Sequence, residues 1–431
     1  MGGGGGNDPT TADFAGDRLL MSEGYTLVWS GWQGDLARGN GRLSIDLPTA
    51  RNADGSPIRR WIMTEYVLYE PASSVSLSWD RGNRGFEPYM PVEESMPYAR
   101  LYERIGLHAP PKLIARHRWS FTTSDTGGAN ARPSKVDVCL SSGFATDRIY
   151  QLVYEARDPL VNGIGFAATR DLVSFLRYNT MRDDPLVSRS GTPDAGAGSP
   201  IRHTLAFGSS QSGRFLKDLI YQGFSQDVQG CIVFDGAIPK VSGSRRQFNN
   251  QEFSMPSRFS TSVESHYYPG DEFPFTYATL TDPVSGRADG LLARCRAHNT
   301  CPKIMHWDSG TEARAVRASL VTTDPLGTHD VELPDDVRVY YLSGTQHGPD
   351  AQPERGFCQQ LSNPLEYVET QRALLLALQR WVVDDVAPPV NRYPRISDGT
   401  LVPPMPQDGV GFPSIPGVRY SGKVNDKMLR D

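Results

Sequence analysis

Residues 202–216 read RHTLAFGSSQSGRFL, a strand-like apolar stretch followed by closely spaced small residues and a helical pattern. Two kinds of site begin in this way: a loop that binds a phosphate, and a tight turn that presents a nucleophile. A phosphate loop has the pattern G-x-x-x-x-G-K-[ST], and Gly208 and Gly213 have its glycine spacing. However, Arg214 replaces its lysine, and Phe215 replaces the hydroxyl residue that would hold magnesium.

The stretch agrees better with the pattern G-x-S-x-G, in which a serine stands on a sharp turn between a strand and a helix. Gly208 and Ser210 fit this pattern, whereas Ser212 replaces the second glycine. Serine is small, and Gly213 follows it directly. We therefore predict Ser210 as the sole nucleophile, with Ser209 and Ser212 as structural neighbours. The alternative is an ordinary turn, because short strings of this kind also arise by chance.

A serine hydroxyl is a weak nucleophile and needs a base beside it, which an acid in turn orients. His347 follows the strand-like VRVYYL in a glycine-flanked turn, and the chain order serine, acid, histidine makes it the candidate base. The alternative is a surface-loop histidine without a chemical role. Three carboxylates follow strand-like stretches. Asp308 and Glu312 fit the acid equally well, and Asp235 comes third because it suits a turn cap.

Attack by a serine also requires backbone N–H groups that bind the developing oxyanion. One donor is the residue after the nucleophile, here Gln211. The second comes from an earlier loop, and the glycine-flanked stretch 30–34 (SGWQG), which contains Trp32, is the candidate.

The composition is that of a globular protein: 38% of the 431 residues are hydrophobic and 22% are charged. A net charge of −5 lacks the basic excess of a nucleic-acid-binding protein. No apolar run approaches the ~18 residues of a membrane span. We therefore expect neither a nucleic-acid partner nor a membrane span.

Of the five cysteines, only Cys295 and Cys301 are close in sequence. They form either a small disulfide loop or two ordinary thiols. A zinc site is not expected, because the spacing C-x-x-C is absent and His298 is an isolated ligand between them.

Hydrophobic periodicity and turn residues predict the elements that would position these side chains. The expected strands are 24–35 (buried, in a parallel sheet), 150–156, 203–207, 231–239 and the beginnings of 301–312 and 337–348; the expected helices are 163–179, 212–223 and 364–385. Residues 41–146 alternate in short pieces between turn residues, which indicates a β-rich, mostly antiparallel insertion. Residues 387–431 are rich in proline and are expected to lie as a strap over the surface.

Alternating buried strands and helices predict an α/β fold with a mostly parallel sheet flanked by helices. Ser210, the acid and His347 each follow a strand, and ligands of such sheets bind beyond the carboxyl ends of the strands. We expect residues 1–431 to form a single elaborated domain.

The segment 240–290 is aromatic and irregular, and we expect it to form a lid or pocket wall. Tyr267, Tyr268, Phe273 and Phe275 would supply its apolar surface. The alternative is that these aromatic residues fill a small satellite core. The candidate substrate-binding residues are Trp32, Tyr267 and Tyr268.

Six strings in order make the chain resemble the α/β-hydrolase superfamily, and within it the "alpha/beta hydrolase domain" proteins: GYTLVWSGWQGD, GIGFAATRDLVSFLRY, GSSQSGRFLKDLIYQGF, VFDGAIP, LLARCRAHNTCPKI and SGTQHGP. The likeness runs from about residue 19 to 385. It implies Ser210 as nucleophile, Glu312 as acid and His347 as base, and therefore favours Glu312 over Asp308. It also implies ester or related acyl hydrolysis without a metal or an organic cofactor. Family members often have Tyr-Trp after the acid, whereas Ala313-Arg314 stand here, so the pocket wall should differ.

These features lead to the hypothesis of a serine hydrolase that cleaves a small-molecule carboxylic ester through an acyl-enzyme. Activity should rise with pH as the His347 imidazole loses its proton. Transfer of the acyl group to an alcohol on the same triad is a close variant. The rival hypothesis is a non-catalytic binding or scaffold protein on a hydrolase-like fold, because a fold does not guarantee a function.

The glycine-rich start, MGGGGGNDPTT, cannot form a buried strand. Before the strand at 203–207 we find only 150–156 and 24–35 as candidates for the hydrolase sheet, so we expect early strands and one oxyanion donor to be missing and activity to be weak. Alternatively, loop 30–34 supplies the donor. An unpaired sheet edge would favour a homo-oligomer. No signal peptide is visible, which predicts a cytoplasmic protein if this start is native.

Overall fold

The computed structural model describes residues 11, 16–37, 41–78, 86–123, 132–179, 185–186, 199–256, 271–348, 352–356 and 360–424. The chain divides into two compact units, residues 1–165 with 249–268, and residues 166–248 with 269–431. The organisation of residues 1–431 as one elaborated domain stays a prediction.

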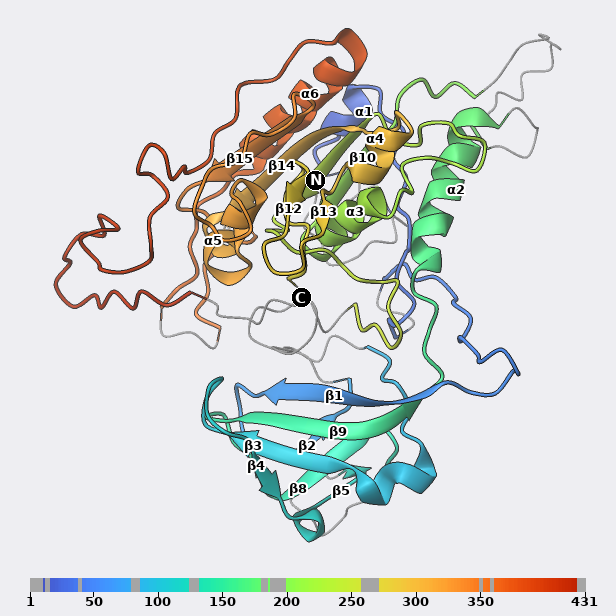
Figure 1. Ribbon diagram of the computed structural model, residues 1–431, viewed down its shortest axis with the longest axis vertical. Coiled ribbons are helices and arrows are strands. Elements are labelled where there is room, and N and C mark those ends of the chain that lie inside the picture. Colours follow the sequence, from blue (N-terminus) through green and yellow to red (C-terminus); the bar gives the residue numbers. More distant parts are fainter. Residues whose placement is uncertain are drawn as a thin grey trace. The chain divides into compact units, whose positions relative to one another are not determined.

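The first unit is built from antiparallel strands, which Figure 1 shows in blue to green. One sheet has the order β1-β9-β3-β4, and a second has the order β2-β8-β5. The elements of this unit are α1 Leu19–Ser22, β1 Arg59–Val67, β2 Ala72–Ser76, η2 Glu93–Tyr98, β3 Arg100–Arg104, β4 Lys112–Ile114, η3 Arg116–Arg118, β5 Trp119–Ser120, β6 Thr122–Thr123, β7 Arg132–Pro133, β8 Asp137–Phe144 and β9 Ile149–Arg157. Side chains of both sheets, among them Tyr66, Val138 and Leu152, share one hydrophobic core.

The predicted strand at 150–156 exists as β9, but its assignment to the hydrolase sheet was wrong. β9 pairs antiparallel with β1 on one side and with β3 on the other, within the first unit. Its alternating burial, with Tyr150, Leu152 and Tyr154 in the core, is that of a strand with one face on a core. The apolar pattern therefore identified a strand without identifying its neighbours.

The prediction of a buried strand at 24–35 was also wrong. These residues form no strand, and Val28 and Trp29 are 50% and 38% exposed. Gly31 and Gly34 instead bring the backbone against residues 43–47, where the N–H of Ile45 donates to the carbonyl of Gln33 at 3.1 Å. A strand needs a hydrogen-bonding neighbour, and none of the strands in the described ranges pairs with this run.

The second unit contains a parallel sheet of four strands in the order β10-β11-β14-β15. Its elements are α2 Ile164–Tyr178, β10 Leu205–Ser209, α3 Gln211–Tyr221, β11 Gly236–Lys240, β12 Leu280–Thr281, β13 Ala288–Asp289, α4 Ala293–Ala297, β14 Lys303–Ser309, α5 Gly310–Ala315, η5 Ala318–Val321, β15 Val337–Leu342 and α6 Val368–Asp384. Strands and helices alternate along this part of the chain, as the sequence predicts for an α/β fold.

Helices α3 and α6 cover opposite faces of this sheet (Figure 1). Lys303 of β14 donates to the carbonyl of Trp381 in α6, and Trp307 lies on the same face because side chains alternate along a strand. Asp308 lies on the other face, where Lys217 of α3 is its electrostatic neighbour. The two faces of β14 therefore carry different polar groups toward the carboxyl end of the strand.

The strand predicted at 231–239 begins later than expected, at Gly236. Residues before it are held in irregular structure by side chains. Asp227 accepts from the N–H of Cys231 at 2.7 Å, and Asp235 accepts from the N–H of Thr204 at 2.8 Å. Asp235 and Thr204 are 31 residues apart, so this contact has no signature in the apolar run itself.

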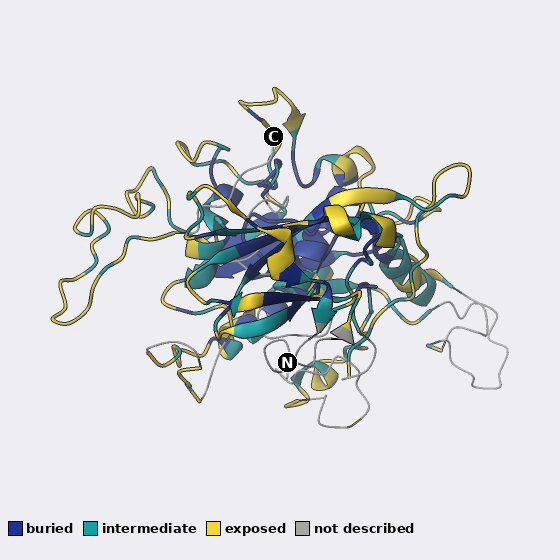
Figure 2. Ribbon diagram, turned by 90° about the horizontal axis from the view of Figure 1, so that it is seen from below, coloured by how far each residue is buried: buried dark blue, intermediate teal, exposed yellow. Residues whose placement is uncertain are grey.

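Residues 387–424 form no helix or strand and are largely exposed (Figure 2). One part of this segment nevertheless lies along the edge of the sheet. Arg392 exchanges backbone hydrogen bonds with Val339 and Tyr341 of β15, at 3.0 and 2.7 Å. The N–H of Val339 also donates to the side chain of Asn391. The edge of β15 is therefore covered by the chain that follows α6.

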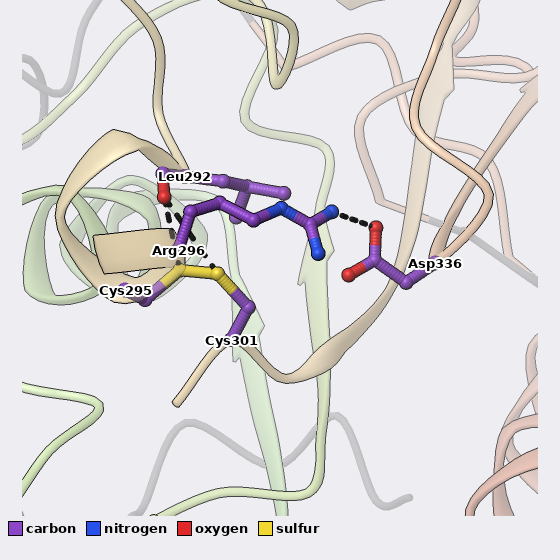
Figure 3. The surroundings of a disulfide bond; sticks show 5 residues. All are labelled: Leu292, Cys295, Arg296, Cys301 and Asp336. Carbon is purple, nitrogen blue, oxygen red and sulfur yellow. Dashed lines mark hydrogen bonds and ion pairs between the residues drawn. A yellow bond between two sulfur atoms is a disulfide. The ribbon is translucent and has the colours of Figure 1, made fainter. Parts of the chain in front are cut away.

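Cys295 and Cys301 form a disulfide, which selects one of the two alternatives left open by the sequence (Figure 3). Cys295 lies in α4, and Cys301 lies just before β14, with 4.8 Å between the two Cα atoms. Arg296 of α4 forms an ion pair with Asp336, just before β15. The disulfide therefore fixes the turn that leads into β14, the strand that contains Asp308 and precedes Glu312.

We expect replacement of both Cys295 and Cys301 by alanine to lower the free energy of unfolding by about 2 kcal/mol, because the short loop is no longer closed in the unfolded chain. Urea unfolding followed by circular dichroism, with and without reductant, measures this difference. Reductant should shift the midpoint of the native protein and of a Cys231→Ala control, but not that of the double variant. An equal shift in the double variant would contradict the expectation.

Candidate active site

Ser210 stands on a sharp turn between β10 and α3. Its backbone dihedral angles, φ 56° and ψ −113°, are strained for a residue with a side chain. The N–H of Ser210 donates to the carbonyl of Lys240, at the end of the neighbouring strand β11, over 2.8 Å. Helix α3 begins directly after it at Gln211. This is the geometry of a nucleophile elbow, which lifts a hydroxyl above the carboxyl end of a sheet.

Two glycines make this turn possible. A Cβ on Gly208 would lie 2.2 Å from the carbonyl oxygen of Ser212, and a Cβ on Gly213 would lie 2.7 Å from that of Lys240. Ser212 stands where the usual pattern has its second glycine, but Gly213 is the residue that lets the helix approach β11. The departure from G-x-S-x-G is thus compensated by the next residue.

Three chain segments bring Ser210, His347 and Glu312 into one hydrogen-bonded series. The Oγ of Ser210 lies 2.8 Å from Nε2 of His347, and Nδ1 of His347 lies 2.5 Å from Oε1 of Glu312. The side chain of His347 is 46% exposed, whereas that of Glu312 is 2% exposed. A solvent-accessible imidazole therefore joins a hydroxyl to a buried carboxylate, which is the arrangement needed to move a proton from serine to histidine.

Glu312 is held in place by the start of helix α5. The N–H and the Oγ of Ser309 both donate to Oε2 of Glu312, at 3.1 and 2.5 Å, and the N–H of Thr311 donates to Oγ of Ser309. This is a capping box, in which the third helical residue and the cap satisfy each other's backbone groups. One carboxylate oxygen thus serves the helix start, and the other serves His347.

The other two acid candidates have different partners. Asp308 accepts from the N–H groups of Ser242 and Gly243 and lies 2.7 Å from Nε2 of His306. Asp235 accepts from the N–H of Thr204 and from Arg177. The structure therefore brings Glu312 to His347, and places neither Asp308 nor Asp235 in hydrogen bonds with it.

The backbone of His347 is also fixed, by two residues that the sequence analysis did not identify. Its N–H donates to Oγ1 of Thr311 at 3.1 Å, and its carbonyl accepts from the hydroxyl of Tyr367 at 2.8 Å. Burial raises the pKa of Tyr367, so this hydroxyl stays protonated and able to donate. No local pattern marks either residue, because both contacts join segments distant in sequence.

Lys240 lies behind this part of the site. Its Nζ is 5.1 Å from the ring centroids of both Trp307 and Tyr367. Burial lowers the pKa of Lys240 to about 8, against the opposing attraction of Glu312. The lysine therefore carries a charge at neutral pH, on the face of the sheet that is covered by α6.

We expect Tyr367→Phe to lower kcat by roughly 2- to 10-fold, because it removes one hydrogen bond worth about 0.5–1.5 kcal/mol from the backbone of His347 and keeps the ring. Steady-state ester hydrolysis measures the effect. Tyr340→Phe is the matched control, since its hydroxyl donates to the carbonyl of Pro389 instead. An equal loss in both variants would count against a role for Tyr367 at His347.

The catalytic and binding roles of all the predicted site residues stay predictions, including those of the remaining candidates. Gln211 is the first residue of α3, so its N–H lies at the helix N-terminus next to Ser210. Trp32 is buried in the first unit, and a second oxyanion donor from loop 30–34 stays a hypothesis. Tyr267 and Tyr268 lie outside the described residues.

Part of the predicted lid segment can be placed. Phe273 and Phe275 are each 5% exposed and pack with Leu320, so these two aromatic residues fill a small satellite core. This is the alternative that the sequence left open for these two residues. The lid hypothesis then depends on residues 257–270, which are outside the described ranges.

Within the described ranges, no three His, Cys, Asp or Glu side chains gather as a metal site. No helix in that part of the chain is long and apolar enough to cross a membrane.

A family model described as "Alpha/beta hydrolase domain" matches residues 115–419. This range contains Ser210, Glu312 and His347. Searches of curated proteins and of solved structures found no match.

Proposed function

Because this chain belongs to the alpha/beta hydrolase domain family, we propose that it is a serine hydrolase that cleaves carboxylic esters through an acyl-enzyme. Family membership by itself supports hydrolase activity in general. The ester specificity and the roles of individual residues are the further content of the proposal.

The observation that carries the proposal is the series Ser210 Oγ, His347 and Glu312 on a strained elbow. An ordinary loop histidine has no reason to hydrogen-bond both a serine hydroxyl and a buried carboxylate. An ordinary turn has no reason to hold a serine at positive φ, which costs about 1–3 kcal/mol. The two features together support a nucleophilic serine.

In the proposed mechanism, Ser210 Oγ attacks the ester carbonyl while Nε2 of His347 takes the hydroxyl proton. Glu312 accepts from Nδ1 of His347, which fixes the tautomer and stabilises the imidazolium. The N–H of Gln211 binds the oxyanion. The imidazolium then protonates the leaving alcohol. Water, deprotonated by His347, attacks the acyl-enzyme and releases the carboxylic acid and free Ser210.

Labelling with a fluorophosphonate probe tests the proposal. We expect the native protein to be labelled at Ser210, as located by peptide mass spectrometry, and to hydrolyse at least one member of a p-nitrophenyl ester series from acetate to octanoate. Adding an alcohol as acceptor then measures how the acyl group divides between water and transfer. A folded protein that neither reacts with the probe nor hydrolyses these esters would instead support a non-catalytic binding protein.

A further inference from the structure

A second histidine–carboxylate pair, His306 and Asp308, lies within β14 and takes no part in the hydrogen bonds of the proposed triad. The side chains of His306 and Asp308 are 0% and 6% exposed, and Nε2 of His306 lies 2.7 Å from Oδ2 of Asp308. The hydroxyl of Tyr277 lies 2.9 Å from Nδ1 of His306 and continues the series inward. The buried position of this pair gives it no access to a substrate, so its function must be exerted through its neighbours.

Asp308 is held as an ionised acceptor. Burial alone would raise the pKa of Asp308, but the charge and hydrogen bond of His306, the charge of Lys217 and the N–H of Gly243 lower it below its ordinary value. Burial also raises the pKa of Tyr277, which keeps the hydroxyl at the end of the series protonated. Asp308 is therefore the anionic member of this series.

The other oxygen of the Asp308 carboxylate accepts hydrogen bonds from the chain that follows β11. Oδ1 of Asp308 accepts from the N–H groups of both Ser242 and Gly243, each at 3.0 Å. Ser242 is fully buried, so neither backbone group would find water if the carboxylate were removed. The carboxylate thus fixes the position of residues 242 and 243.

The same short segment holds the nucleophile. The carbonyl of Lys240 accepts from the N–H of Ser210, and the N–H of Val241 donates to the carbonyl of Trp307 in β14. The carbonyl of Gly243 accepts from Nζ of Lys217, two turns into the helix that begins after Ser210. Residues 240–243 are therefore hydrogen-bonded to Ser210 through Lys240 and to helix α3 through Gly243. The N–H groups of residues 242 and 243 are hydrogen-bonded to Asp308.

We propose that Asp308 is a positioning residue of the reaction: it holds residues 240–243, and through them it keeps Ser210 in its strained, reactive conformation. This inference rests on the proposed function of Ser210. The strain at Ser210 persists only if the surrounding structure enforces it, and the carbonyl of Lys240 is part of that structure. A displacement of about 1 Å at a reacting atom can cost on the order of 100-fold in rate.

Three substitutions at Asp308 distinguish the effect of the position of the accepting oxygen from the effect of the carboxylate charge. Asp308→Ala leaves two buried N–H groups unsatisfied, and we expect kcat to fall by about 30- to 100-fold with KM changed less than about 2-fold. Asp308→Asn keeps an oxygen for the two N–H groups, and its amide group stays within hydrogen-bond reach of Nε2 of His306. We therefore expect Asp308→Asn to keep kcat within about 5-fold of the native value. Asp308→Glu keeps the charge but displaces the acceptor by one methylene, and it should lose more kcat than Asp308→Asn.

Asp218→Ala is the matched control for the loss of a buried carboxylate. Asp218 is also fully buried and accepts a backbone N–H, that of Phe248, at 2.8 Å. Thermal unfolding should show a similar destabilisation in Asp218→Ala and Asp308→Ala, while only the latter loses kcat beyond about 3-fold. If Asp308→Ala does not fold, the comparison of Asp308→Asn with Asp308→Glu decides the question.

Three outcomes would overturn the inference. These are a better activity in Asp308→Glu than in Asp308→Asn, an equal loss of kcat in Asp218→Ala and Asp308→Ala, or unchanged rates of fluorophosphonate labelling in all Asp308 variants. The labelling of the native protein keeps this inference separate from the proposed function. If the native protein is not labelled at Ser210, the proposed function fails; if it is labelled and the Asp308 variants react at its rate, only the positioning role fails.

Discussion

Replacement of Ser210 by alanine is expected to lower kcat for ester hydrolysis by about 10⁶-fold and to abolish fluorophosphonate labelling. The hydroxyl is the only atom of the proposed site placed to form the acyl bond, because its Oγ lies 2.8 Å from Nε2 of His347. The residual activity should be that of binding and oxyanion stabilisation alone, about 10³–10⁴ over water. This residual rate is measured by following ester hydrolysis over long incubations, with the native protein and the variants purified in parallel.

The neighbouring serines provide the control. Ser209 is the last residue of β10, and Ser212 is in the first turn of α3, so neither occupies the strained turn. We expect Ser212→Ala to keep labelling and most of kcat. Labelling that persists in Ser210→Ala and disappears in Ser212→Ala would show that the nucleophile has been assigned to the wrong serine.

The second large effect is expected for Glu312→Gln, which should lower kcat by about 10⁴-fold with little effect on KM. Both oxygens of Glu312 accept hydrogen bonds, Oε1 from His347 and Oε2 from Ser309. A glutamine amide has one accepting and one donating end, so it cannot replace both. If its NH₂ group faces Ser309, two donors meet. If it faces His347, the imidazole must carry its proton on Nε2 and can no longer accept from Ser210.

This prediction is checked by kcat, KM and urea unfolding of Glu312→Gln beside those of Asp308→Asn. The former should lose most of its rate and keep its fold, and the latter should remain active. If Asp308→Asn is the more damaging change, the acid has been misassigned. Recovery of activity in Glu312→Gln at alkaline pH to the native level would also contradict the tautomer argument.

The turn at Ser210 and the chain order of the candidate residues could be predicted from the sequence, because both predictions depend on residue types in short stretches. Gly208, Ser210 and Gly213 are close in sequence, and the steric reason for each glycine is local or nearly so. The choice between Asp308 and Glu312 was different: the spacing left it open, and only the family resemblance favoured Glu312. Glu312 rather than Asp308 meets His347 because of where β14 ends. Asp308 is still part of the strand, on the face toward α3, whereas Glu312 lies in the first turn of α5.

The errors concern strand pairing: one strand has other neighbours than expected, and one strand-like stretch forms no strand. Residues 150–156 are a strand, but only the hydrogen-bonded register shows that their neighbours are β1 and β3. Residues 24–35 have a strand-like composition, but none of the strands in the described ranges pairs with them. Likewise, Thr311 and Tyr367 reach the backbone of His347 through contacts that no window of sequence contains. Non-local pairing is the information that composition and periodicity lack.

The capping box at the start of α5 has a consequence for protein engineering. Because Oε2 of Glu312 belongs to the helix start and Oε1 to the imidazole, the four residues Ser309 to Glu312 behave as one transferable element. A loop graft that replaces the residues after β14 would have to carry this element whole. Replacing only Glu312, for instance by the shorter Asp, would leave a side chain too short to reach both His347 and Ser309. The residue that hydrogen-bonds His347 is therefore also part of the start of α5, and a designer can vary the residues around Glu312 more freely than Glu312 itself.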